Sequence, residues 1–153
     1  SYPVNIVELC VRYGFKVFEE YLPKDVSGFI VSQQDCFKDY GANKVIVVNL
    51  ADSARRRRFT IAHELAHYIL HKNQSEIIYA HRDAGQTGGI ETEANIFASN
   101  ILMPEELVRQ ALNELMCSGN CVPTIAEKAN HISNQFAVSI PAARVRLEQL
   151  HIS

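Results

Sequence analysis

The residues of this chain whose types and spacing could do chemistry stand together in one short segment, HELAH, at residues 63–67. Neutral imidazoles, here His63 and His67, are good ligands for Zn²⁺, and a carboxylate that is not a ligand can take a proton from water at the metal. Glu64 supplies that carboxylate. The segment therefore indicates metal-dependent hydrolysis, with water as the nucleophile. A helix that carries two histidines by chance also fits five residues, so a third ligand has to decide.

One helix must place both histidines on the same side. Ser53 is a suitable N-cap, and residues 54–71 contain neither glycine nor proline to interrupt a helix. With 3.6 residues per turn, His63 and His67 are about 40° apart around the axis and about 6 Å apart along it. Both imidazoles can therefore reach one ion, with Glu64 beside them.

His71 lies on nearly the same face of this helix, but about 12 Å along the axis from His63. An unbroken helix cannot bring it to the same ion. The chain also lacks a glycine directly after His67, which would allow the turn that returns a third histidine in metzincins. We interpret His71 as a residue of the last helical turn, where a basic side chain suits the helix dipole.

A carboxylate from a second helix is the other known third ligand, as in His₂Glu zinc sites. The segment GGIETEANIFASNILMPEEL offers Glu91 and Glu93. Glu91 is favoured because Asn95, one turn later, shares its face and could bond the second ring nitrogen of a ligand histidine. Glu93 points about 200° away from Glu91, toward different surroundings.

The whole chain has the size and composition of one globular domain. Its 153 residues, 47% of them hydrophobic, are enough for one core. A net charge of −2 gives no basic field, so we expect no direct nucleic-acid partner. The chain shows neither an apolar run of about 18 residues nor a secretory signal. With four irregularly spaced cysteines, we expect reduced thiols, a cytoplasmic location and no membrane contact.

The hydrophobic patterns change character near residue 51. We expect a helix at 6–13, strands at 15–21, 28–33 and 44–50, and helices at 53–72, 90–102, 104–116, 123–132 and 139–150. A small sheet followed by helices is an α+β arrangement. We expect a single domain, 1–153, with mainly sheet in 1–50, metal-binding helices in 53–116 and a helical pair resembling a helix-turn-helix in 123–150.

The segments RFTIAHELAHYILH and IETEANIFASNILMP, in this order, resemble the ImmA/IrrE family of bacterial metallopeptidases. The resemblance extends from the KVIVVN strand to RLEQL near the end of the chain. It implies a zincin-like fold, in which an N-terminal helix and a small twisted sheet precede a helical bundle that carries HExxH. It also implies that His63, His67 and Glu91 bind Zn²⁺ and that Glu64 is the catalytic base.

The resemblance implies a partner as well. Family members similar to this chain cleave a cognate helix-turn-helix (Xre-type) transcriptional repressor and so switch on mobile-element transfer or a stress response. Some are encoded beside such repressors in toxin-antitoxin-like or prophage operons. Two other functions stay open: a catalytically silent relative that sequesters the repressor, and a DNA-binding regulator that uses the C-terminal helices with Arg144 and Arg146. The oligomeric state is not predicted.

The segment at 73–89, between the two metal-binding helices, is polar and rich in glycine, so we expect a mobile loop. Such a loop could supply a donor that stabilises the transition state. Tyr79 and His81 are the first candidates, and Tyr68 and His131 are further ones.

An extended substrate can pair with an exposed edge strand of a zincin-like sheet. From the sequence we expect that edge to be the strand at 28–33 or the strand at 44–49.

Overall fold

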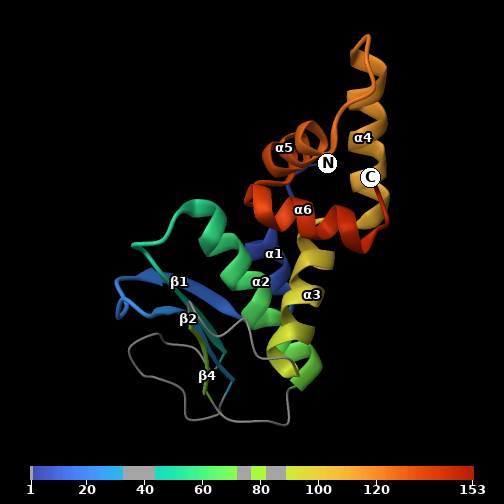
Figure 1. Ribbon diagram of the computed structural model, residues 1–153. Coiled ribbons are helices and arrows are strands. Elements are labelled where there is room, and N and C mark those ends of the chain that lie inside the picture. The colour runs from blue at the N-terminus through green and yellow to red at the C-terminus, as the bar shows by residue number, and fades with distance from the viewer. Residues whose placement is uncertain (1, 33–43, 72–76, 82–88) are drawn as a thin grey trace. The chain divides into compact units, whose positions relative to one another are not determined.

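The computed structural model describes residues 2–32, 44–71, 77–81 and 89–153, and of 77–81 only the backbone (Figure 1). The chain divides into two compact units, Asn5–Ala98 and Ser99–Ser153, the second of which includes Ser1–Val4. The expected α+β class is confirmed, because an N-terminal helix and a small mixed sheet precede a run of helices. This order agrees with a zincin-like fold, while the single domain stays a prediction.

The first unit contains the whole sheet. Its elements in chain order are α1 (Ile6–Arg12), β1 (Lys16–Glu20), β2 (Val26–Val31), β3 (Val45–Asn49), α2 (Ala54–His71), β4 (Ile77–His81) and the start of α3 (Ile90–Leu102). The strand order is β1-β3-β2-β4. β1 runs parallel to β3, whereas β2 is antiparallel to both of its neighbours.

Two expectations about the sheet are wrong. The segment expected to be a loop contains a fourth strand, β4, although 73–76 and 82–88 lie outside the described residues. The strands expected at the edge, at 28–33 and 44–49, correspond to β2 and β3, which are the two interior strands. The edges are β1 and β4. Strand order depends on partners distant in sequence, as when Phe29 stands between Val47 and Tyr79.

Helix α2 packs on one face of the sheet, against β2 and β3 (Figure 1). Strand β3 is buried along its whole length. Gly28 of β2 makes this close approach feasible. A Cβ atom there would stand 2.6 Å from the backbone oxygen of Val47 and 2.7 Å from Cγ2 of Thr60 on α2. Only a residue without a side chain fits between strand and helix at this distance.

The start of α2 is fixed by side-chain hydrogen bonds. The predicted cap is confirmed, since Oγ of Ser53 accepts from the backbone nitrogen of Arg56 at 3.2 Å. Asn49, at the end of β3, shapes the preceding turn. Its Nδ2 donates to the backbone oxygen of Val26 at 2.9 Å, and its Oδ1 accepts from the backbone nitrogen of Ala51 at 3.0 Å. The HELAH segment therefore starts from a defined position above the sheet.

The second unit contains the end of α3 with α4 (Glu105–Ser118), α5 (Ile125–Phe136) and α6 (Ile140–Gln149). A capping box between Thr124 and Glu127 begins α5. Ser139 caps α6, and a proline stands in its first turn, as the sequence indicates. Among the described residues, no helix combines the length and apolar character that a membrane span requires.

Arg146 of α6 is a buried residue of the second unit. Its Nε donates to the backbone oxygen of Met103 at 2.9 Å, and its Nη1 donates to Oδ1 of Asn100 at 2.6 Å. Its exposed fraction is 6%, so its guanidinium is engaged inside this unit. One of the two arginines considered for DNA binding therefore serves packing.

Candidate metal centre

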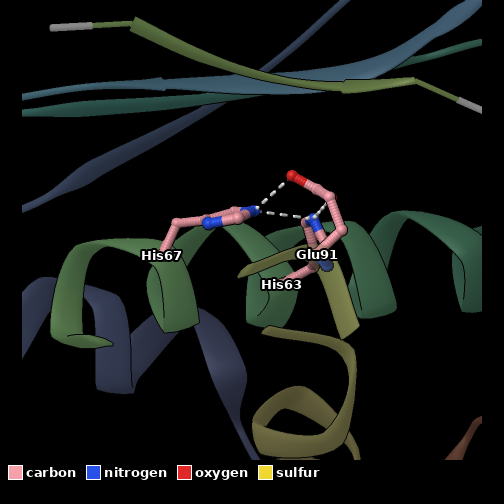
Figure 2. Close-up of side chains that lie close together, drawn as sticks. All are labelled: His63, His67 and Glu91. Atoms are coloured by element: carbon pink, nitrogen blue, oxygen red, sulfur yellow. Dashed lines mark hydrogen bonds and ion pairs between the residues drawn. The ribbon is translucent and has the colours of Figure 1, made fainter. Parts of the chain in front are cut away.

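Three side chains with metal-binding atoms converge where α2 meets the first turn of α3 (Figure 2). Nε2 of His63 lies 3.0 Å from Oε2 of Glu91, and Nε2 of His67 lies 3.1 Å from Oε1 of the same carboxylate. The two Nε2 atoms are 3.1 Å apart. Both histidines are buried, and the side chain of Glu91 is 20% exposed. The structure thus brings together the three side chains that the sequence singled out.

The protonation states of the side chains in this cluster suit the binding of a cation. Nδ1 of His63 lies 2.8 Å from Oδ1 of Asn95, and since an amide oxygen only accepts, Nδ1 donates to it. Burial and, after it, the neighbouring His63 lower the pKa of His67 to about 4. The contact with His63 lowers the pKa of Glu91 more than burial raises it. At neutral pH the site therefore offers a neutral imidazole at His67 and an ionised carboxylate at Glu91.

Two ring nitrogens and a carboxylate that face one another this closely can share a single cation, either a proton or a metal ion. His63, His67 and Glu91 place their ligand atoms within 4.8 Å of one another. Two imidazole nitrogens and a carboxylate are a donor set suited to a divalent metal ion. The residues present therefore fit a metal ion.

Glu64 is a carboxylate buried beside this cluster. Its residue is 0% exposed, and neither of its oxygens has a hydrogen-bond partner among the described residues. Burial raises the pKa of Glu64 well above its usual range, and the Glu91 carboxylate raises it further. A buried carboxylate without a partner is costly for stability, and such groups concentrate at functional sites.

A peptidase family model described as the IrrE N-terminal-like domain matches residues 10–148, which include the whole cluster. The chain belongs to this family. The resemblance seen in the sequence is therefore confirmed, and relatives of the chain include proteins named metalloprotease and metallopeptidase.

Three proteins illustrate the sequence similarity of this chain to known relatives. The radiation response metalloprotease IrrE of Deinococcus radiodurans is 34% identical over 90 residues, which are 57% of this chain and 27% of that protein. The uncharacterised immunity region protein 2 of Bacillus phage phi105 is 30% identical over 109 residues, 71% of this chain and 65% of that protein. Metallopeptidase ImmA of Bacillus subtilis is 27% identical over 66 residues, 43% of this chain and 39% of that protein. The chain spans less than two thirds of each of them.

In this member of the IrrE-like family, His71 has a role that the sequence interpretation missed. It ends α2, as expected, but its side chain is buried. Its Nδ1 lies 3.2 Å from Nδ1 of His67, and its Nε2 lies 3.1 Å from Oε2 of Glu93. The four-residue spacing between the two histidines was the available signal, because it puts them on one face of the helix.

The structure places only some of the side chains that were candidates for a transition-state donor. Tyr79 and His81 belong to β4 by their backbone, and their side chains lie outside the described part of the structure. The hydroxyl of Tyr68 accepts from Nζ of Lys44 at 2.7 Å, and its ring packs edge-on against Phe15. Tyr68 therefore serves the packing of the first unit.

His131 belongs to the second unit. Its Nε2 lies 3.1 Å from the backbone oxygen of Ala111, so it donates to this oxygen and joins α5 to α4. This bond gives His131 a structural role within the helical unit.

Proposed function

We propose that this protein is a zinc-dependent endopeptidase. The observation that carries the proposal is the convergence of His63, His67 and Glu91 beside a buried carboxylate, Glu64, which has no hydrogen-bond partner among the described residues. Membership of a peptidase family and relatives named metalloproteases support it. Zinc is the proposed ion because catalytic zinc sites commonly use two histidines and one glutamate.

The residues divide the chemistry between them. His63, His67 and Glu91 would hold the ion, which when bound polarises the scissile carbonyl and makes water more acidic. Glu64 takes a proton from the attacking water and passes it to the leaving amine. A carboxylate with a raised pKa suits this exchange, because its proton affinity is closer to that of the groups it serves. Asn95 keeps the ring of His63 in the orientation that turns Nε2 toward Glu91.

The proposed substrate is a helix-turn-helix repressor of the Xre type that is encoded near this chain. The protein would then act as an anti-repressor in the cytoplasm, as part of a mobile element or a toxin-antitoxin-like operon. The resemblance to repressor-cleaving family members supports this substrate. So does the likeness to a protein named for a phage immunity region.

Direct DNA binding is less well supported than proteolysis. Arg146 is buried and bonded within the second unit, which leaves Arg144 as the exposed member of the pair. The net charge of −2 provides no general attraction to phosphates. The C-terminal helices suit a contact with a protein better than a contact with DNA.

The proposal is tested with the small helix-turn-helix protein encoded beside this chain. The two proteins are incubated with zinc, and the products are identified by mass spectrometry. We expect cleavage at one site, which a chelator abolishes and added zinc restores. A stable complex without cleavage would instead identify a catalytically silent relative that sequesters the repressor. Metal analysis of the purified chain determines which ion it binds.

A further inference from the structure

Each histidine of the candidate metal centre has a second hydrogen-bonding partner, and the two partners differ in kind. Nδ1 of His63 meets the neutral amide of Asn95 at 2.8 Å. Nδ1 of His67 meets Nδ1 of His71 at 3.2 Å, and His71 continues through Nε2 to Oε2 of Glu93 at 3.1 Å. A hydrogen-bonded series of three side chains, the His67–His71–Glu93 series, therefore links the candidate centre on α2 to α3.

The exposed fraction of the side chain rises along the His67–His71–Glu93 series. The side chain of His67 is 0% exposed, that of His71 7% and that of Glu93 63%. The charge of Glu93 therefore stays in water, where it avoids the desolvation cost of a buried ion. Buried His71 has both ring nitrogens engaged, which fixes the orientation of its ring.

When both imidazoles are neutral, one arrangement of protons gives each contact from Nδ1 of His67 to Glu93 a donor and an acceptor, and Glu91, with Oε1 3.1 Å from Nε2 of His67, is the competing acceptor for the His67 proton. The ionised carboxylate of Glu93 can only accept, so Nε2 of His71 donates to it. A neutral His71 then has its lone pair on Nδ1, and Nδ1 of His67 donates to that atom. The remaining lone pair of His67 is on Nε2, which is the atom that faces His63 and Glu91.

We propose that His71 and Glu93 are positioning residues that fix the tautomer and ring orientation of His67 before a metal ion binds. The inference rests on the proposed function, because it treats His67 as a ligand. Removing the outer partner of a ligand histidine typically costs about 10- to 100-fold in metal affinity. A merely structural tie between α2 and α3 would change stability without changing the tautomer of His67.

The tautomer can be measured without metal or substrate. Long-range proton–nitrogen NMR spectra of the full, metal-free chain at pH 8, above the ordinary imidazole pKa of about 6.5, report which nitrogen of His67 carries the proton. We expect Nδ1 in the wild type. His71→Phe keeps a ring but removes the acceptor, so His67 should shift toward the Nε2–H form. His71→Asn places an oxygen near the former Nδ1 and should restore Nδ1–H. A wild-type His67 protonated on Nε2, or an unchanged tautomer in His71→Phe, would overturn the proposal.

Zinc affinity gives a second readout, by competition with a chelator. His71→Phe should bind zinc about 10- to 100-fold more weakly, and His71→Asn should recover most of this loss. Glu93→Ala should cause a smaller loss, because Glu93 is exposed and acts through His71. Thr92→Ala, at an exposed position of the same turn, is the matched control and should match the wild type. Equal affinities of wild type and His71→Phe would contradict the proposal. The NMR result does not depend on proteolysis, so an inactive peptidase would leave it intact.

Discussion

Nδ1 of His63 lies 2.8 Å from Oδ1 of Asn95, across 32 positions of sequence. This bond sets the ring so that Nε2 faces Glu91. We expect Asn95→Ala to weaken zinc binding about 10- to 100-fold, because the ring loses the acceptor that fixes it. Asn95→Asp keeps an oxygen acceptor and should bind zinc nearly as the wild type does. Chelator competition measures both, and equal affinity of wild type and Asn95→Ala would show that this bond does not position His63.

Glu91 and Glu93 stand two residues apart on α3 and should respond differently to removal. Glu91 contacts both His63 and His67, so Glu91→Ala should abolish tight zinc binding. Glu93→Ala should retain tight binding, with at most the moderate loss expected for a positioning residue. Isothermal calorimetry on the two variants gives the comparison. Tight zinc binding by Glu91→Ala would remove Glu91 from the ligand set.

The candidate ligands could be predicted from the sequence because their geometry is local. His63, Glu64 and His67 lie within two turns of one helix, and Ser53 marks where that helix starts. The choice of Glu91 depended on a second local relation, its four-residue spacing from Asn95. Such relations follow from helix geometry alone, so they were available before any fold was known.

The features that the sequence did not predict all depend on distant partners. The bond of His71 to Glu93 joins two helices across 22 positions, and helix geometry alone does not reveal it. Strand β4 is short and follows directly on residues that resemble a loop, so its pairing with β2 was not evident. The same pairing makes β2 an interior strand.

The buried position of His67 predicts a pH dependence of stability in the metal-free protein. Its pKa is about 4 in the folded state, against about 6.5 in an unfolded chain. Between these values the unfolded chain binds a proton that the folded chain does not, so the free energy of unfolding falls as the pH falls. From pH 7 to pH 5 this loss is about 2 kcal/mol.

Urea denaturation of metal-free wild type and His67→Phe at the two pH values measures this contribution. The difference between the two losses reports His67 together with its coupling to the neighbouring His63, Glu91 and His71. We expect the wild type to lose about 2 kcal/mol more than the variant. Equal losses would mean that His67 takes up its proton in the folded chain as readily as in the unfolded one.

The close approach of α2 to the sheet predicts that Gly28 cannot carry a side chain. Gly28→Ala should lower the free energy of unfolding by about 1–3 kcal/mol, because the new methyl group would overlap Thr60 and the backbone of Val47. Thr60→Ser removes Cγ2 and should recover part of this loss in the double variant. Gly119→Ala, whose Cβ would be 3.8 Å from its nearest neighbour, should be tolerated. Thermal denaturation compares the wild type, Gly28→Ala, the double variant and Gly119→Ala. A Gly28→Ala variant as stable as the wild type would contradict the close contact.

Glu64 provides the most direct test of the central claim, that this chain is a metal-dependent peptidase. Glu64→Gln keeps the size of the side chain but removes its capacity to accept a proton. It leaves His63, His67 and Glu91 in place, so zinc content and repressor affinity should not change. Paired time courses of repressor cleavage, with zinc measured in both proteins, should show that the variant is about 10²- to 10⁴-fold slower. Equal cleavage rates at equal zinc content would contradict the role of Glu64 as the general base and with it the proposed mechanism.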